Sequence, residues 1–332
     1  MELKPKILVL YTGGTIGMIQ SKNGTYVPFS LEGLLDCVPQ VNHLGIDILV
    51  ESFENPLDSA FIGPNEWLKM SRIISEKYNL VDGFVVLHGT DTMAYTSSAL
   101  SFLLRGLDKP VILTGAQIPI YEKESDGVGN FINALEIAKE GIVKEVGLWF
   151  HKTLYKGACV TKSHSKDFKG FSSPNHTVLA CKEQYVNYNK FAFSLGKFDR
   201  LFFDKIQSKV FYLNLLPQMQ KELQAKVISE NTIEGVVLSV FGSGTAPLKE
   251  KDFLFKTLKN KKIPIIVVSE CFEGGLELGK YEAGSVLKKL DVISGKNMTK
   301  EAAITKMMIG TANFKDNLEL RDFLEENQVG EF

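Results

Sequence analysis

Cysteine is scarce in this chain of 332 residues, and its four cysteines lie far apart in the sequence. They are Cys37, Cys159, Cys181 and Cys271. Without a C-x-x-C pair, the sequence offers neither the ligand spacing of a zinc site nor the dense disulfide framework of a small secreted domain. We therefore expect reduced thiols and no zinc.

Long hydrophobic runs are also absent. No stretch of about 18 apolar residues occurs, which excludes a membrane-spanning helix. The N-terminal run ILVL is far shorter than the apolar region of a signal peptide, and no small-residue cleavage site accompanies it. We expect this run to form a first buried strand, and the protein to be soluble and cytoplasmic with no membrane partner.

The chain has no excess of charge of either sign and no nucleotide-binding loop. Lys and Arg total 38, Asp and Glu total 39, and the formal net charge is −1. This balance lacks the basic footprint of a protein that binds nucleic acid, so a small neutral or zwitterionic ligand fits better. The run GGTIG does not have the G-x-G-x-x-G spacing, and no G-x-x-x-x-G-K-[ST] motif occurs.

Apolar runs rich in Val and Ile alternate with amphipathic segments along most of the chain. The first series has expected strands at residues 6–11, 46–52, 83–89, 110–116 and 146–152, and helices at residues 64–79, 91–106 and 130–142. The second has strands at residues 209–216, 234–242 and 263–272, and helices at residues 219–231 and 249–260. This alternation predicts an α/β fold whose mostly parallel sheets are flanked by helices.

Residues 186–208 show neither the pattern of a strand nor that of a helix, and they mix aromatic with charged side chains. We therefore expect two α/β domains, at residues 1–188 and 210–332, joined by a linker at residues 189–209. In an open parallel sheet, ligands bind outside the carboxyl ends of the strands. Three expected strands end there in polar motifs: YTGGTIG with Thr12 and Thr15, LHGTDTMAY with Thr90, Asp91 and Thr92, and LTGAQIP with Thr114 and Gln117.

Each of these motifs has a structural and a chemical interpretation. Asp91 or Thr92 can cap the helix that follows Gly89, or the glycine can let a ligand approach unpaired amides. The TGGT run can be a plain glycine-rich turn, or Thr15 can be a nucleophile. A threonine hydroxyl reacts only when a base removes its proton.

The sequence offers few candidates for that base. The five histidines, none of which forms an H-x-x-x-H pair, are His43, His88, His151, His164 and His176. His88 and His164 lie near motifs, but a lone histidine is more often a structural hydrogen-bonding residue. Lys162 follows the apolar run ACV; it is either a partly buried lysine that can act as a base or a solvated side chain.

Taken together, the motifs carry a resemblance. In chain order, YTGGTIGM, DGFVVLHGTDTMAYTSSALSF, KPVILTGAQIP, SDGVGNFINAL and VTKSH resemble the bacterial L-asparaginase family, and HGTDTMAYTSSALSF most resembles its cytoplasmic type I branch. GSGTAP, ECFEGG and NMTKEAAITK fall at corresponding places of that family's second domain. The resemblance implies hydrolysis of L-asparagine to L-aspartate and ammonia through an acyl-threonine, without metal or organic cofactor, in a homodimer or homotetramer.

The resemblance also implies roles for individual residues. Thr15 matches the nucleophile, and Thr90, Asp91 and Lys162 match a hydrogen-bonded triad that moves protons. Tyr26, in the segment SKNGTYVP, matches the tyrosine of a lid that closes over the nucleophile.

For the substrate, the resemblance implies that Ser59 holds its carboxylate and that Asp91 pairs with its ammonium. Backbone amides near Gly14, Gly89 or Thr90 would stabilise the oxyanion. The substrate-binding set implied in full is Gly14, Asp58, Ser59, Gly89, Thr90, Asp91 and Ala116.

Some residues depart from the family pattern. Thr245 replaces an asparagine that reaches the neighbouring subunit, and Ser239 replaces an arginine of allosterically controlled type I enzymes. Cys271 falls near that regulatory position, and we expect a buried structural thiol there. The alternative functions are an amidotransferase subunit, a glutaminase-asparaginase and a non-catalytic amino-acid sensor. The first carries an extra N-terminal domain, for which a TGGT motif starting at residue 12 leaves no room.

Overall fold

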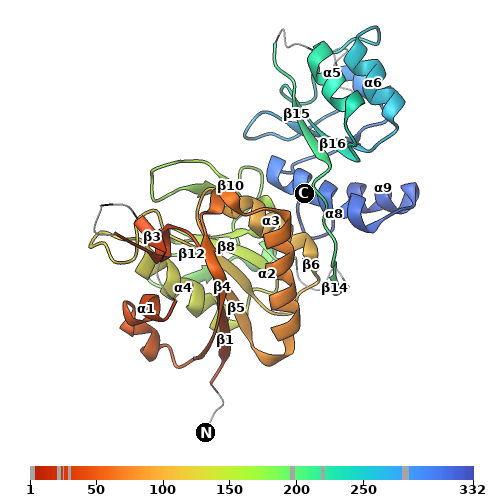
Figure 1. Cartoon of the computed structure of the whole chain (residues 1–332). Coiled ribbons are helices and arrows are strands. Elements are labelled where there is room, and N and C mark those ends of the chain that lie inside the picture. The colour runs from red at the N-terminus through yellow and green to blue at the C-terminus, as the bar shows by residue number, and fades with distance from the viewer. Residues whose placement is uncertain are drawn as a thin grey trace. The chain divides into compact units, whose positions relative to one another are not determined.

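The computed structural model describes residues 4–20, 24, 26–28, 31–194, 199–217, 221–278 and 284–332. For residues 26–28, 31 and 32 it describes the backbone only. The chain forms two compact units (Figure 1). Unit 1 comprises Met1–Ser173 and Thr177–Asp204, and unit 2 comprises Pro174–His176 and Lys205–Phe332.

Unit 1 is built on an eight-stranded sheet with the order β13-β12-β9-β8-β7-β5-β1-β4. Its strands are β1 (Lys6–Gly13), β4 (Asp47–Leu57), β5 (Gly83–Leu87), β7 (Val111–Thr114), β8 (Val146–Phe150), β9 (Thr153–Lys156), β12 (Ala180–Lys182) and β13 (Val186–Tyr188). The strands from β4 to β8 are parallel, and β9, β12 and β13 continue the sheet antiparallel. β5 and β8 are buried along their whole length, as expected for parallel strands covered on both faces.

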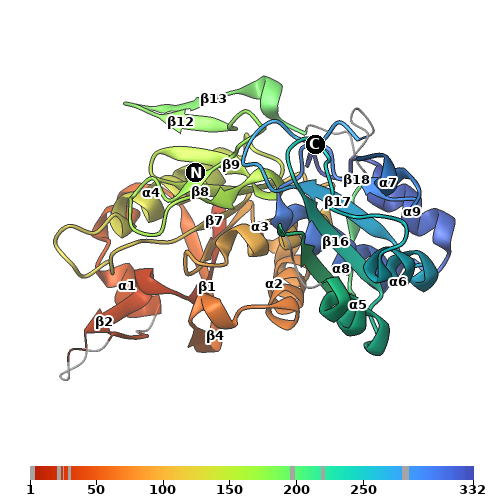
Figure 2. The same ribbon diagram turned by 90° about the horizontal axis from the view of Figure 1, so that it is seen from above.

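Helices cover both faces of this sheet, as the two views show (Figure 2). They are α1 (Leu31–Asp36), α2 (Pro64–Lys77), α3 (Met93–Leu103) and α4 (Gly127–Glu140). In α4, Phe131 and Leu135 belong to the same buried cluster as Val9 of β1 and Val85 of β5. Because alternate strand residues point to opposite faces, this packing leaves the other face of β1 and β5 to α2 and α3.

Short elements complete unit 1. β2 (Met18–Gln20) pairs with β3 (Tyr26–Pro28), β10 (Thr161–Lys162) with β11 (Phe171–Ser172), and β6 (Leu104–Arg105) with β14 (Leu201–Phe202). The helix expected at residues 91–106 therefore ends earlier, because Leu104 and Arg105 join a strand pair. Residues 189–204, which we expected to be part of a linker, belong to unit 1.

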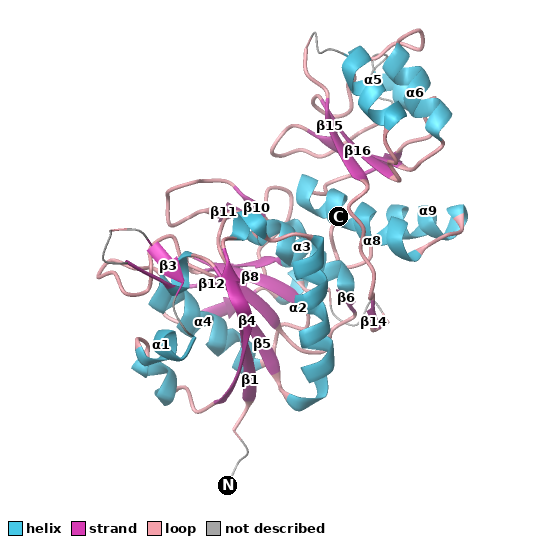
Figure 3. Cartoon of the chain, in the orientation of Figure 1, coloured by secondary structure: helices cyan, strands magenta, loops and turns pink. Residues whose placement is uncertain are grey.

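Unit 2 has a parallel four-stranded sheet with the order β15-β16-β17-β18. Figure 3 labels β15 and β16 among its magenta strands. Its strands are β15 (Val210–Asn214), β16 (Gly235–Val240), β17 (Ile265–Ser269) and β18 (Ile293–Ser294). Its helices are α5 (Lys221–Glu230), α6 (Phe253–Lys261), α7 (Ser285–Lys288), α8 (Lys300–Asn313) and α9 (Asn317–Glu325). Ala225 of α5 and Leu254 of α6 share a buried cluster with Leu238 of β16.

The structure bears on two expectations from the sequence, one about membrane-spanning helices and one about the cysteine thiols. Within the described ranges, no helix is long and apolar enough to span a membrane. All four cysteines are free thiols. The expectation of a buried Cys271 is wrong: the side chain is exposed, because the residue lies past the end of β17 in a loop.

Candidate active site

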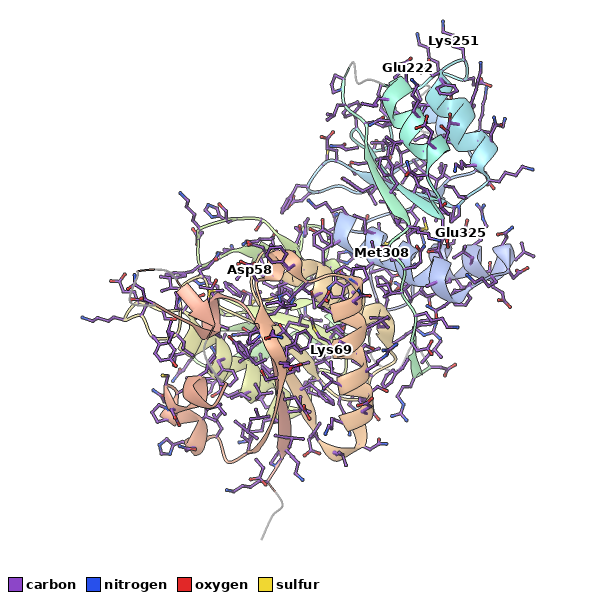
Figure 4. All side chains as sticks on the ribbon, in the orientation of Figure 1. Asp58, Lys69, Glu222, Lys251, Met308 and Glu325 are labelled. Carbon is purple, nitrogen blue, oxygen red and sulfur yellow. The ribbon has the colours of Figure 1, made fainter. Side chains whose placement is uncertain are left out.

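Three loops meet at the carboxyl edge of the unit 1 sheet, where Figure 4 labels Asp58 at the end of β4. After β1, Gly14 has a φ of 88°, and a Cβ placed on it would lie 2.2 Å from the backbone nitrogen of Gly89. A Cβ on Gly89 would lie 2.6 Å from Ser59 Oγ. Only glycine permits such close backbone approach, so these glycines bring the TGGT, HGTDT and PLDSAF segments into contact.

The two threonines of the TGGT segment have different surroundings. Thr12 is buried, and its hydroxyl donates to the Leu87 carbonyl at 2.9 Å, which ties β1 to β5. Thr15 is partly exposed at the start of the short 3-10 turn Thr15–Gly17. No hydrogen bond to another described residue engages the Thr15 hydroxyl. Thr15 is therefore the threonine of the pair whose hydroxyl is available to a ligand.

Tyr11 supports the turn that carries Thr15. Its hydroxyl donates to the Gly17 carbonyl at 3.1 Å. Burial raises the pKa of Tyr11 to about 12, so the phenol stays protonated and keeps donating at neutral pH. The backbone at Ile16 is held as well, because its carbonyl accepts from the Ile120 amide at 3.3 Å.

A lysine and a threonine from distant segments meet beside this turn. Lys162 Nζ, on β10, donates to Thr90 Oγ1 at 2.9 Å and to Asp91 Oδ1 at 2.5 Å. The Lys162 side chain is 17% exposed, whereas that of Asp91 is 66% exposed. Lys162 is therefore mostly buried against a hydroxyl, and the Asp91 carboxylate remains open to solvent and to a ligand.

The helix-cap interpretation of the HGTDT segment is wrong for α3. Thr92 occupies the position before the helix without capping it through its side chain, and its hydroxyl donates instead to the Ser59 carbonyl at 2.6 Å. The Asp91 carboxylate is engaged by Lys162. Both side chains therefore bond to other segments at this edge of the sheet, and neither caps the first turn of α3.

The structure also decides which backbone amides could stabilise an oxyanion. The Gly14 amide donates to the Leu57 carbonyl at 3.1 Å and is therefore already engaged within the protein. The amides of Gly89 and Thr90 are not used in any hydrogen bond between described residues. They remain the candidates on this edge.

Gln117 and Asp126 complete the polar network. Asp126 was not identified as a site residue from the sequence. Thr90 Oγ1 donates to Gln117 Oε1 at 3.4 Å, and Gln117 Nε2 donates to the Asp167 carbonyl at 2.9 Å. Asp126 accepts from the Gln117 amide at 3.0 Å and holds the loop after β7. Gln117 was marked by its place after an expected strand, whereas no such signal singles out Asp126.

The remaining expected site residues have varied surroundings. Ser59 and Ala116 are buried, whereas Asp58 is exposed and accepts from the Ala60 amide at 2.9 Å. The Tyr26 backbone belongs to β3, but its side chain and most of the expected lid lie outside the described residues. Thr114 is buried and donates to the Trp149 carbonyl, so it ties two strands together.

Neither histidine near the motifs is placed as a base. His88 is fully buried, and burial lowers its pKa to about 4. His164 accepts the Lys166 and Asp167 amides on its Nδ1, which orders its own loop. Among the described residues, no group of His, Cys, Asp and Glu is arranged to hold a metal ion.

Comparisons with known proteins agree with this architecture. The family model "Asparaginase, N-terminal" matches residues 6–194, and "Glutaminase/Asparaginase C-terminal domain" matches residues 209–324. L-asparaginase 1 of Escherichia coli K12 is 34% identical over 334 residues, covering 99% of this chain and 98% of the relative.

Solved structures of asparaginases have a similar fold. The thermostable L-asparaginase from Thermococcus kodakarensis superposes with a TM-score of 0.90 at 32% identity, covering 98% of each chain. L-asparaginase I from Vibrio cholerae gives a TM-score of 0.88 at 31% identity, covering 99% of each chain. The fold of two α/β domains, expected from the alternation of apolar and amphipathic segments, is thus confirmed. The chain belongs to the asparaginase family.

Proposed function

We propose that this protein hydrolyses L-asparagine to L-aspartate and ammonia, with Thr15 as the nucleophile. The observation that carries the proposal is the hydrogen bond from Lys162 Nζ to Thr90 Oγ1, at the sheet edge where Gly14 and Gly89 touch. A mostly buried amine bonded to a hydroxyl is an arrangement suited to moving protons. The names of the full-length relatives support asparagine as the substrate.

The reaction proceeds in two steps. Thr15 Oγ attacks the carbon of the substrate's side-chain amide, while its proton is transferred to the leaving nitrogen through the Thr90 and Lys162 pair. The C–N bond breaks and ammonia leaves, so that an ester joins the aspartyl group to Thr15. Water then attacks the ester carbon, the Thr15 oxygen takes back a proton, and aspartate is released.

Charge develops on the substrate's carbonyl oxygen during each attack. The amides of Gly89 and Thr90 are the proposed donors to this oxyanion. Removing one such donor typically costs ~10²–10³ in kcat, because the donors are fixed in advance where the charge appears.

The substrate's two charged ends need partners of opposite kind. We assign the substrate ammonium to Asp91, whose carboxylate is exposed beside Lys162. The carboxylate is assigned to Ser59, which lies against Gly89. Tyr26 is assigned to a lid, because β2 and β3 form a hairpin that follows the Thr15 turn directly. A cytoplasmic homodimer or homotetramer is part of the same proposal.

A coupled ammonia assay with L-asparagine and L-glutamine tests the function. The wild-type protein is expected to release ammonia from asparagine. Thr15→Ala is expected to lose at least ~10³ in kcat, because no other group can form the ester, and Thr15→Ser to retain more because it keeps a hydroxyl. Near-normal turnover by a folded Thr15→Ala protein would contradict the assignment, and no release from asparagine by the wild type would contradict the function.

A further inference from the structure

A buried chain of hydrogen bonds runs behind the HGTDT segment. Trp67 Nε1, from α2, donates to Thr96 Oγ1, on α3, at 2.9 Å. The same Thr96 oxygen lies 2.9 Å from His88 Nε2, and His88 Nδ1 lies 2.6 Å from the Gly89 carbonyl oxygen. Thr96 and His88 are both 0% exposed, so the chain excludes water.

The chemistry of the two ends decides the direction of every bond. The indole of Trp67 can only donate, and the Gly89 carbonyl can only accept. Thr96 therefore accepts a hydrogen bond from Trp67 and donates one from its hydroxyl to His88 Nε2. His88 must then carry its hydrogen on Nδ1 and donate it to Gly89. A neutral imidazole with this one tautomer satisfies each group in the chain.

The chain ends on the peptide unit that the proposed reaction uses. No peptide bond between described residues is cis. In a trans peptide the carbonyl and the N–H point in opposite directions. With the Gly89 oxygen held by the His88 ring, the N–H of Thr90 is directed away from the ring, and no described residue accepts it.

We propose that His88 is a positioning residue, which with Thr96 and Trp67 fixes the Gly89–Thr90 peptide so that the Thr90 amide is aimed at the oxyanion. This inference rests on the proposed function, since it assigns a task to a donor of that same site. The interaction is made in the transition state, so its loss lowers kcat and leaves KM nearly unchanged. His88 itself touches no reacting atom.

Thr96→Val is the informative change, because it removes the hydroxyl and keeps the shape. Nε2 of His88 then loses its donor, while Nδ1 keeps its hydrogen for the Gly89 oxygen, so the ring is held from one side only. We expect kcat to fall about 10- to 100-fold with KM within about twofold, as small displacements of catalytic groups cost rates of this order. Trp67→Phe keeps the Thr96 hydroxyl and is expected to show a smaller fall in kcat.

Thr305→Val is the matched control. Thr305 is also 0% exposed on a helix, but its hydroxyl donates to the Glu301 carbonyl of its own helix in unit 2. It is expected to keep wild-type kcat. Comparing the two variants therefore separates the effect of breaking the hydrogen-bond chain from the effect of removing any buried hydroxyl.

Nitrogen NMR of the full-length protein, with ¹⁵N-labelled histidine, gives a readout that does not depend on turnover. The wild-type His88 ring is expected to be neutral with Nδ1 protonated, and Thr96→Val to shift the Nε2 resonance, which loses its hydrogen bond, while Nδ1 stays protonated. An Nε2-protonated wild-type ring, or equal kcat in Thr96→Val and Thr305→Val, would overturn the inference. If Thr96→Val does not fold, Trp67→Phe decides by the same two measurements. A wild type that does not act on asparagine contradicts the proposed function, whereas the ring tautomer tests the hydrogen-bond chain independently.

Discussion

Lys162 Nζ lies 2.9 Å from Thr90 Oγ1, although 72 positions separate the two residues in the chain. The pairing of β10 with β11 holds Lys162 at the edge of unit 1, and Thr90 follows β5. A hydrogen bond from a charged, mostly buried donor is stronger than one between neutral groups. The two side chains are therefore expected to act as one unit.

That coupling is measurable by a double-mutant cycle. Lys162→Met alone should lower kcat nearly as much as Lys162→Met combined with Thr90→Val, because either change already breaks the unit. Lys182→Met is the control, since Lys182 pairs with Glu136 elsewhere in unit 1 and should keep its rate. Losses in kcat that simply multiply in the double variant would show that the two residues act independently.

The contact between the TGGT and HGTDT segments depends on Gly14 having no side chain. Gly14→Ala would place a Cβ 2.2 Å from the Gly89 nitrogen at a φ of 88°, so the segments must separate. Because a displacement of about 1 Å can cost ~10² in rate, kcat should fall by at least that factor. Gly129→Ala, in α4 with no atom within 4 Å of the added carbon, should leave the rate unchanged. Equal rates in the two variants would refute this account.

Protonation of His88 should weaken the folded state in acid. The pKa of the buried ring is about 4, against 6.5 for an ordinary histidine. Between these values the unfolded chain binds a proton that the folded chain does not. Unfolding free energy should therefore fall by up to about 1.4 kcal/mol per pH unit as the pH drops from 6.5 toward 4. Urea unfolding across this range measures the slope, and His88→Gln should flatten it by about one proton; an unchanged slope in a folded variant would contradict the prediction.

Ser239 leads to a kinetic prediction. It lies within β16 and is 1% exposed, and its Oγ has no hydrogen-bond partner among the described residues. A buried serine cannot supply the bidentate contact of an arginine, worth roughly 1.5–3 kcal/mol, to a regulatory carboxylate. The rate of ammonia release should rise hyperbolically with asparagine, with a Hill coefficient near 1. A clearly sigmoidal curve would show that regulation survives without the arginine.

Much of the fold follows from local pattern. The continuous apolar runs at residues 83–89 and 146–152 became β5 and β8, because parallel strands buried on both faces must be apolar throughout. The short strands β9, β12 and β13 carried no such signal. Each has only three or four residues, and its strand conformation depends on antiparallel pairing at the end of the sheet.

The candidate site, too, could be predicted only in part from the sequence. Motif position marked Thr15, Thr90 and Lys162, but it could not tell that Thr12 would tie two strands together while Thr15 remained accessible. It also suggested a helix cap where Thr92 instead bonds to Ser59. These outcomes depend on which strand lies beside which, and residue spacing does not carry that information.

By itself, the sequence determined the α/β class and the glycine-rich strand ends that carry polar side chains, because periodicity and turn chemistry are local properties of the chain. Only the tertiary structure decided which groups meet there. It engaged the Gly14 amide with Leu57, left the Thr90 amide unused by other described residues and placed His88 between Thr96 and Gly89. Hydrogen bonds between distant segments form only after the order of the strands has brought their ends to one edge of the sheet.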